Sequence, residues 1–303
     1  MAEEGIEKAS PAGLKEELLQ KHMAVMTAEE SLREGLKAEL LEKHMAAVIT
    51  AEEALPEGLK AELMPKHVAV IMDGNRRWAR ERGMAVEVGH REGRRVMAEL
   101  ARLSSLWGIK VLSVFAFSTE NWTRPREELE ALMSLYEEVV TTYGEEDFER
   151  HNSGYNARVS FMGDRSKLPE SLVEKMNIAE EKTKANKGLH IIIGLNYSGR
   201  YDIMQATRSI VSKVKDGILQ IEDINEKLIS EEMETNCAEF PVPDLLIRTS
   251  GEQRISNFML WQLAYTELYF AEKKFPEFEE EDYVEALISF QKRDRRFGGM
   301  KYK

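Results

Sequence analysis

The sequence predicts an α/β protein in which a parallel β-sheet is covered by helices. Past Gly58, short apolar runs alternate with longer stretches that mix charged and apolar residues, which is the pattern of repeated β-α-β units. Several of the apolar runs are continuous, as expected for strands with helices on both faces of the sheet. A chain of 303 residues with 43% apolar content can bury a core of this kind.

Six short apolar runs are the candidate strands. In chain order they are VAVIM (68–72), VLSVFAF (111–117), RVSFM (158–162), HIIIGL (190–195), DLLIR (244–248) and LYF (268–270). Stretches with a helical mixture of apolar and charged residues lie between them, at 91–106, 126–141, 170–185, 201–215 and 255–265. This alternation predicts crossover helices between parallel strands.

Residues 1–57 are interpreted as a separate, helical N-terminal extension. The segment GLKEELLQKHMAVM begins at Gly13 and recurs, slightly changed, from Gly35 and from Gly58. Two incomplete copies fall below the roughly three repeats that a stacked array needs, so a tandem duplication is the better interpretation. We expect the functional domain to span 58–303 and the extension to be dispensable.

The composition excludes several classes of function. A net charge of −12 and a pI near 5.2 have the wrong sign for a general nucleic-acid binder. No apolar run approaches the ~18 residues of a membrane span, and the one cysteine, Cys237, has no partner for an internal disulfide. The opening residues MAEEGIEKAS are acidic, unlike a transit peptide. We expect a cytoplasmic protein, or a plastid protein if a transit peptide has been removed.

Polar residues cluster directly after four of the candidate strands. DGN follows the first strand, STENW the second, NYSGR the fourth and RTSGEQR the fifth. In an open parallel sheet, ligands bind beyond the carboxyl ends of the strands. Each loop alone could be an ordinary turn, but the four together predict one shared cleft.

Arginines accompany three of these loops. Gly74 permits a close backbone approach, and a helix that begins near Arg76 would present free N–H groups to an anion. Planar guanidinium groups suit phosphate recognition. The arginines concerned are Arg76, Arg77, Arg124, Arg248 and Arg254. We therefore expect a phosphate site, whereas Arg80 and Arg82 are better interpreted as solvent-exposed.

Asp73 lies in the middle of this positive charge. A carboxylate among arginines suggests Mg²⁺ bridging to phosphate oxygens, with Glu267 as a second candidate ligand. From its position alone, however, Asp73 is better explained as the cap of the following helix. His90 has no cysteine or histidine at metal-ligand spacing. Neither GxxxxGK[ST] nor GxGxxG occurs, so nucleotide binding has no support.

Five blocks of sequence resemble, in order, those of the cis-prenyltransferases, also called Z-type isoprenyl diphosphate synthases. They are HVAVIMDGNRRWA, FAFSTENWTRP, GLNYSGRYDI, DLLIRTSGEQRISNFMLWQLAYTELYF and RDRRFGG, and they cover about 58–300. The DDxxD motif of trans-type synthases is absent. The resemblance implies six mostly parallel strands surrounded by helices, and Mg²⁺-dependent addition of isopentenyl diphosphate to an allylic diphosphate with Z geometry.

The resemblance also implies roles for individual residues. Asp73 would be the catalytic residue that binds Mg²⁺, assisted by Glu267, and Asn75, Ser118 and Asn121 would act beside it. The residues around the allylic diphosphate would be Gly74, Asn75, Arg76, Arg77, His90 and Arg124. The residues that hold isopentenyl diphosphate would be Arg248, Arg254 and Ser256.

Hydrocarbon contacts and partner contacts follow from the same resemblance. Trp78, Phe117 and Trp122 would line the hydrocarbon side of the site. RFG at 296–298 matches an RxG motif through which one subunit can complete its partner's active site, so a homodimer is expected, with Arg296 and Gly298 near the partner's site.

The sequence leaves the product open. Many bacterial members have an arginine thirteen residues after the catalytic aspartate, whereas this chain has Val86. Two alternatives are an irregular or cyclising coupling of C5 diphosphates on the same fold and, less favoured, a non-catalytic partner subunit. Product length would depend on side chains from about 126–141 and 190–195, whose packing the sequence does not reveal.

Overall fold

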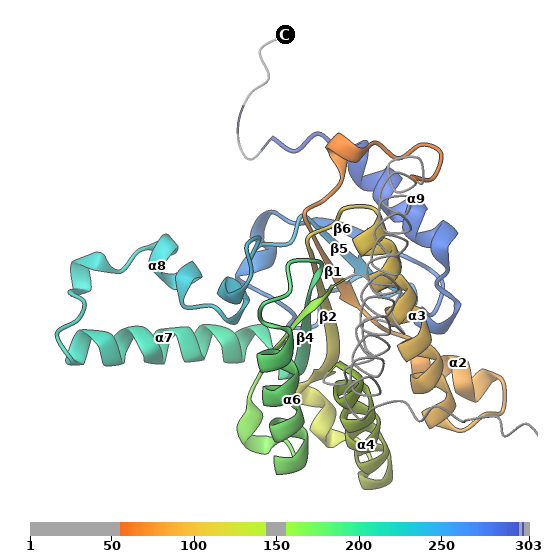
Figure 1. Ribbon diagram of the computed structural model, residues 1–303, viewed down its shortest axis with the longest axis horizontal. Coiled ribbons are helices and arrows are strands. Elements are labelled where there is room, and N and C mark those ends of the chain that lie inside the picture. Colours follow the sequence, from red (N-terminus) through yellow and green to blue (C-terminus); the bar gives the residue numbers. More distant parts are fainter. Residues whose placement is uncertain (1–54, 144–155, 297–298, 300–303) are drawn as a thin grey trace, which may run out of the picture. The chain divides into compact units, whose positions relative to one another are not determined.

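The computed structural model describes residues 55–143, 156–296 and 299 of the chain (Figure 1). The described residues belong to one compact unit, Leu55–Lys303. The predicted helical extension falls, up to residue 54, outside the described residues. Within the described ranges, no helix is both long and apolar enough to cross a membrane.

The predicted six-stranded sheet is confirmed, and all of its strand pairs are parallel. The strands are β1 (His67–Ile71), β2 (Val111–Ser118), β3 (Arg158–Met162), β4 (His190–Tyr197), β5 (Leu245–Arg248) and β6 (Glu267–Phe270). Their order across the sheet is β3-β4-β2-β1-β5-β6. The first strand therefore lies in the interior of the sheet, between β2 and β5.

Four of the predicted helices are confirmed, with shifts of a few residues at their ends. The helices are α2 (Asn75–Glu81), α3 (Val86–Leu106), α4 (Arg126–Tyr143), α6 (Glu170–Thr183), α7 (Gly199–Lys215), α8 (Glu226–Glu231) and α9 (Glu280–Gln291). Short 3-10 helices are η1 (Ala61–Leu63), η2 (Thr119–Thr123), η3 (Arg165–Lys167), η4 (Ile221–Asp223), η5 (Glu234–Cys237), η6 (Gln262–Tyr265) and η7 (Phe275–Glu277).

The helix predicted at 255–265 is wrong. Only its last four residues form a 3-10 helix, and Ser256, Asn257 and Met259 have φ values of 47°, 60° and 44°. These left-handed conformations cannot continue a right-handed α-helix. The segment is instead a compact loop whose apolar residues pack on the sheet.

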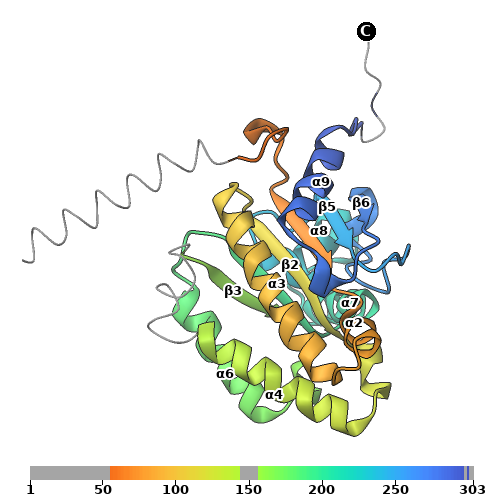
Figure 2. The same ribbon diagram turned by 90° about the vertical axis from the view of Figure 1, so that its right-hand side faces the viewer.

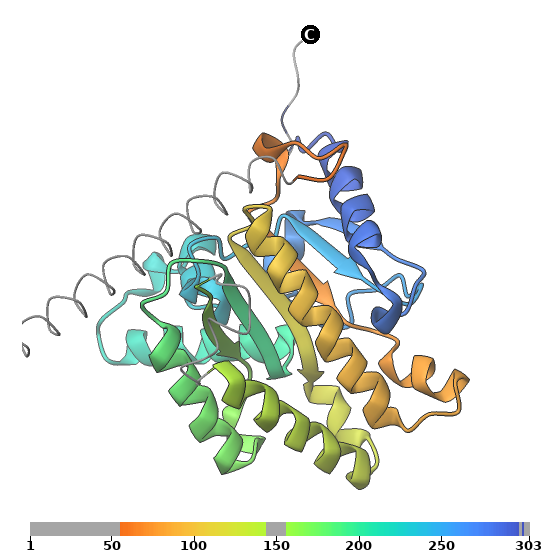
Figure 3. The same ribbon diagram turned by 45° about the vertical axis from the view of Figure 1, so that its right-hand side comes forward.

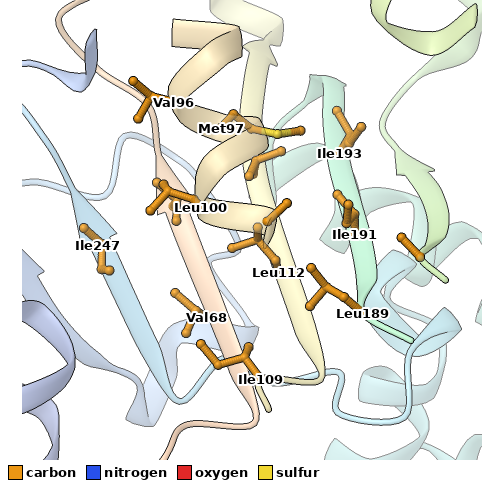
Figure 4. Packing of buried hydrophobic residues seen from close by; sticks show 14 of the residues in the cluster. Val68, Val96, Met97, Leu100, Ile109, Leu112, Leu189, Ile191, Ile193 and Ile247 are labelled. Carbon is orange, nitrogen blue, oxygen red and sulfur yellow. The ribbon is translucent and has the colours of Figure 1, made fainter. Parts of the chain in front are cut away.

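The two faces of the sheet are buried by different segments. Val68 and Val70 share a core cluster with buried residues of α3, α4, α6 and α9. Figures 2 and 3 show α3 lying along this face, and Figure 4 shows Val96, Met97 and Leu100 of α3 above the strands. Ala69 and Ile71 belong to a second cluster, which includes Phe258 and Met259. Alternate residues of one strand thus serve opposite faces.

The amino ends of the strands are joined by polar side chains. Asp244 accepts hydrogen bonds from the backbone N–H groups of Lys66 (2.8 Å) and His67 (3.1 Å), and from Arg295 (2.9 Å). His67 Nε2 lies 2.7 Å from Ser113 Oγ, in the neighbouring strand. His190 and Ser160 form an equivalent pair between β4 and β3, at 2.8 Å.

Candidate active site

The polar loops after β1, β2, β4 and β5 lie at the same edge of the sheet, because all the strands run in one direction. Asp73 follows β1, Ser118 ends β2, and Arg248 ends β5 directly beside Ile71. Ser198 follows β4 and caps α7, accepting a hydrogen bond from the Tyr201 backbone N–H. Two adjoining cavities open between these loops.

The first cavity has a volume of about 430 Å³, a polar rim and an apolar interior. Charged and polar residues of the rim include Asp73, Asn75, Arg76, Arg77, His90 and Arg124. The apolar lining includes Met97, Phe115, Leu132, Tyr136, Val139 and Ile193. Arg80, which the sequence suggested was simply solvent-exposed, also lines this cavity.

The second cavity, of about 600 Å³, is lined by more polar than apolar side chains. Its lining contains the predicted site residues Asp73, Ser118, Asn121, Arg124, Arg248 and Ser256. It also contains Glu120, Arg200 and Asn257, which the sequence analysis did not single out. Asp73 and Arg124 line both cavities, so a group bound in one cavity lies next to a group bound in the other.

Asp73 is held between two arginines. Its Oδ2 accepts from Arg248 Nη2 at 2.9 Å and its Oδ1 from Arg77 Nη2 at 3.3 Å. Burial alone would raise the pKa of this carboxyl, but the hydrogen bond and the charges of the two arginines outweigh burial and lower the pKa below its usual value. The helix α2 begins at Asn75 with Gly74 as its N-cap residue, and no side chain caps it. The capping explanation for Asp73 is therefore wrong.

Arg248 is fixed from several sides and is only 4% exposed. Its Nη1 donates to the Arg254 carbonyl and to Ser256 Oγ, both at 2.6 Å, while its Nε is buried without a partner. Arg254 in turn forms an ion pair with Glu252, which also pairs with Arg77. The arginines predicted at this loop are thus linked to Asp73 through one network.

Glu128, which the sequence analysis missed, organises the other arginines. This carboxylate is 8% exposed and pairs with Arg76 at 3.2 Å and with Arg124 at 3.3 Å. His90 lies beside them with its Nε2 buried and unpartnered. Burial, with the nearby charges of Arg124 and Arg76, lowers the pKa of His90 to about 4, so the ring is neutral at pH 7.

Two glycines on α3 let the loop after β1 approach closely. A Cβ on Gly89 would overlap the Asn75 carbonyl, and a Cβ on Gly93 would overlap Asn75 Oδ1. Asn75 Nδ2 donates to the Met72 carbonyl at 3.2 Å, whereas its Oδ1 is buried without a partner. The Asn75 amide is therefore oriented, and its oxygen lies against Gly93 without a hydrogen-bond partner.

The predicted aromatic residues lie elsewhere than expected. Trp78, Phe117 and Trp122 do not line the first cavity. Phe117 is 1% exposed and packs edge-on against Trp122 at a centroid distance of 5.0 Å. The Trp78 ring instead lies under the Arg82 guanidinium, 4.6 Å away. Phe117 is therefore part of the core, whereas Trp78 and Trp122 are half-buried outside the first cavity.

Glu267 is also displaced from the expected position. Glu267 is the first residue of β6 and pairs with Leu245, at the amino end of β5. Asp73 lies near the carboxyl end of β5, because it follows Ile71 of β1, which pairs with Arg248. Three residues of strand separate the two ends, about 10 Å. Glu267 pairs with Arg293 at 2.7 Å. One chain therefore cannot place Asp73 and Glu267 on one ion.

Three further expectations concern Val86, the C-terminal RxG motif and the grouping of metal-ligating side chains. Val86 lines a smaller cavity of about 240 Å³ together with His90, Glu128 and residues of α4. Arg296 is described and donates to Asp294 at 2.7 Å, but Gly298 lies outside the described residues. Within residues 55–143 and 156–296, no group of three or more His, Cys, Asp or Glu side chains forms a metal cluster.

Comparisons with known proteins agree with this geometry. A family model described as "Putative undecaprenyl diphosphate synthase" matches residues 71–298. Cis-prenyltransferase 7, chloroplastic, of Solanum lycopersicum is 56% identical over 76% of this chain and 79% of its own length. The chloroplastic (2Z,6Z)-farnesyl diphosphate synthase CPT6 of the same organism is 53% identical over 77% of this chain and 78% of its own length.

A solved structure shows the same fold. The lavandulyl diphosphate synthase from Lavandula x intermedia, in complex with dimethylallyl diphosphate, is 44% identical and superposes with a TM-score of 0.72. The match covers 78% of this chain and 99% of that protein. The fold, the paired cavities and these similarities agree: the chain belongs to the cis-prenyltransferase family and is a prenyl-transferring enzyme.

Proposed function

We propose that this enzyme condenses isopentenyl diphosphate with an allylic diphosphate to give a Z-configured prenyl diphosphate. The observation that carries this proposal is the pair of cavities that share Asp73 and Arg124. The first cavity combines several arginines with more apolar side chains than the second cavity has, which suits an allylic diphosphate and its growing hydrocarbon. The second cavity, with Arg248 and Ser256, suits the diphosphate of isopentenyl diphosphate.

The rim of the first cavity would act on the leaving diphosphate. As the allylic C–O bond breaks, negative charge grows on the diphosphate and positive charge spreads over the allylic carbons. Arg76, Arg77 and Arg124 are placed to stabilise that negative charge. Charge-assisted hydrogen bonds contribute roughly 1.5–3 kcal/mol each. The π-bond of isopentenyl diphosphate then attacks the allylic carbon, and a proton is lost.

The residues at the rim fit the expected Mg²⁺. Asp73 stays ionised because its pKa is lowered, and Asn75 Oδ1 is a buried oxygen without a partner. Mg²⁺ is commonly bound by one or two carboxylates together with substrate phosphates and water, so Asp73 with at most one further carboxylate fits this ion. The ion would add positive charge beside the leaving diphosphate. Asp73 and Asn75 are the residues of this chain that would hold it.

The name of one relative supports regular coupling and a short or medium product. CPT6 carries the name (2Z,6Z)-farnesyl diphosphate synthase, and that name motivates this choice. Irregular coupling of two C5 units is the second candidate, because the lavandulyl diphosphate synthase shares the fold at 44% identity. The intact loop of Asp73, Gly74 and Asn75 disfavours a non-catalytic partner subunit.

Product analysis separates these candidates. Purified protein would be incubated with Mg²⁺ and C5, C10 or C15 allylic diphosphates, with and without isopentenyl diphosphate, and the products sized by mass spectrometry. Regular condensation requires isopentenyl diphosphate and extends the chain by C5 units. A product from dimethylallyl diphosphate alone would support irregular coupling, and absence of any product would overturn both candidate reactions.

A plastid location is proposed from the chloroplastic relatives. Imaging the full-length chain fused to a fluorescent protein tests this location.

A homodimer explains the displaced Glu267. This residue pairs with Arg293, in the same segment as Arg296, which the family resemblance places near the partner's site. Glu267 would then complete the metal site of the partner rather than its own. Exposed apolar side chains on and after α7 offer a dimer face: Met204, Val211, Ile218, Ile221 and Ile224. Figure 1 shows α7 and α8 standing out from the sheet.

Mixing two inactive variants tests the dimer. Asp73→Asn and Glu267→Gln chains would be unfolded, combined in equal amounts and refolded. If the two residues act across the interface, half of the dimers contain one intact site, and activity returns to about a quarter of wild type. If both residues act within one chain, mixing restores nothing.

A further inference from the structure

Arg200 lines the second cavity, and the proposed function assigns no role to its positive charge. It is the second residue of α7, it is exposed, and its side chain lines the cavity alongside Arg248 and Ser256. The motif NYSGR contains it, but nothing in the sequence distinguished it from a surface arginine.

The neighbouring arginines are already paired with carboxylates. Arg124 pairs with Glu128, Arg248 with Asp73, and Arg254 with Glu252. In the part of the chain that the structure describes, no carboxylate lies within ion-pair distance of the Arg200 guanidinium. Arg200 therefore keeps its positive charge available for a bound anion, whereas the others must share theirs.

The charges around the cavity depend on this residue. Three arginines, Arg124, Arg200 and Arg248, line it together with the carboxylates of Asp73 and Glu120. Without Arg200, two positive charges would face two negative ones. A diphosphate carries several negative charges, so it requires the positive excess that Arg200 supplies.

The backbone of Arg200 is fixed by Asn257. The Asn257 Oδ1 accepts from the Arg200 N–H at 3.0 Å, and its carbonyl accepts from the Gly199 N–H at 2.6 Å. Its Nδ2 donates to Glu120 Oε1 at 2.8 Å. Gly199 packs so closely on Leu260 that a Cβ would lie 2.6 Å from the Leu260 nitrogen. The start of α7 is thus held beside Ser256, the residue that precedes Asn257.

We propose that Arg200 is a further substrate-binding residue, whose guanidinium binds the diphosphate of isopentenyl diphosphate together with Arg248 and Ser256. This inference rests on the proposed function of the second cavity. Arg200 does not line the first cavity, so its contribution is confined to one of the two substrates.

Steady-state kinetics of Arg200→Met and Arg200→Lys test the proposal. Loss of one charge-assisted contact should raise the KM for isopentenyl diphosphate about 10- to 100-fold in Arg200→Met, with less effect in Arg200→Lys. The KM for the allylic diphosphate should change less than threefold. The matched control is Arg208→Met, an exposed arginine on the same helix that does not line the cavity, which should leave both KM values within twofold.

Direct binding distinguishes failure of this inference from failure of the proposed function. Calorimetry would measure isopentenyl diphosphate binding to the wild type and to the folded variants, with folding checked by circular dichroism. If the wild type binds and Arg200→Met binds equally well, or if both KM values rise together, Arg200 does not have this role. If the wild type neither binds isopentenyl diphosphate nor turns it over, the proposed function itself fails. An Arg200→Met chain that does not fold leaves Arg200→Lys to decide by the same criteria.

Discussion

The two ends of the sheet contain similar polar residues but treat them differently. At the amino end, Asp244 accepts hydrogen bonds from two backbone N–H groups and from Arg295, and Glu267 pairs with Arg293. Buried polar atoms without a partner in the described residues are concentrated at the carboxyl end, although His67 Nδ1 at the amino end is another. Those at the carboxyl end are Asn75 Oδ1, Arg76 Nε, His90 Nε2, Arg248 Nε and Ser250 Oγ.

The unpartnered polar atoms indicate that the carboxyl end of the sheet binds a ligand, whereas the amino end stabilises the fold. Leaving a buried donor or acceptor unpaired costs about 1–3 kcal/mol, so a cluster of such atoms is maintained only where something repays the cost. Carboxylates at the amino end hold strands and the chain ends together. Those at the carboxyl end, Asp73 and Glu128, hold arginines around a cavity that an anionic substrate can enter.

The largest expected effect compares one aspartate from each end. Asp73→Asn should lower turnover at least about 100-fold, because the charge beside the leaving group is lost. Asparagine is preferred to alanine because Arg248 is buried and needs an acceptor. Asp244→Asn should leave turnover per folded molecule within about twofold but lower stability by about 1–3 kcal/mol.

Kinetics and thermal unfolding of both variants check this pair. The assignment of the reaction to the carboxyl end and of stability to the amino end is contradicted by either of two results. One is turnover of Asp73→Asn within tenfold of wild type, and the other is a loss of turnover in folded Asp244→Asn as severe as that in Asp73→Asn.

A methyl group on α3 should have the next largest effect. Gly93→Ala would push against Asn75 Oδ1 and displace the loop that carries Asp73. Because a displacement of about 1 Å can cost 100-fold in rate, we expect turnover to fall about 10- to 100-fold while the helix is retained. Ala98→Gly alters an exposed position of the same helix and should leave turnover unchanged. Equal turnover of both variants would show that the loop tolerates the shift.

The sequence could predict what depends on local pattern. Continuous apolar runs identified β1 and β4, and the loops after the strands led to Asp73 and the arginines, because parallel strands bring their carboxyl ends together. The helix prediction for 255–265 was wrong because the left-handed conformations in this segment depend on tertiary contacts, such as those from Asn257 to the start of α7. The hydrophobic periodicity of a sequence does not report tertiary contacts of this kind.

The missing site residues have similar explanations. Glu128 lies in the first turn of α4, where an acidic residue is normal for any helix. Its role follows from the approach of Arg76, which lies in α2 and is far from Glu128 in the sequence. Phe117 matched a motif but points into a core that sequence similarity does not describe. In contrast, α9 was not among the predicted helices although its sequence has the amphipathic pattern and the Glu279–Asp282 capping box of an ordinary helix.

Histidines from the two ends should respond differently to a bound anion. Burial lowers the pKa of both His90 and His190 to about 4, but two arginines of the site add to the effect at His90. Inorganic pyrophosphate would offset the charges of Arg76 and Arg124 and so favour the protonated ring. We expect the pKa of His90 to rise by about one unit or more, and that of His190 to stay unchanged. Histidine ring NMR titrations with and without pyrophosphate measure both; bound pyrophosphate without a shift at His90 would place the anion elsewhere.

The smallest expected effect concerns residues 1–54, because the described residues that follow them lead into the amino end of β1. Leu59 and Met64 are buried, Leu55 packs against the same core, and Lys60 exchanges hydrogen bonds with Gln291. A chain that begins at Leu55 keeps all of these contacts and should retain turnover within about twofold and the same product length. A chain that begins at Lys66 loses the buried side chains of Leu59 and Met64, each worth about 1.5–3 kcal/mol, and should unfold at lower temperature. Unfolding temperature, turnover and product size for the two truncations decide the point. More than a tenfold loss of turnover in the folded Leu55 chain would mean that the extension shapes or covers the active site, and the separation between the two ends of the sheet would not hold.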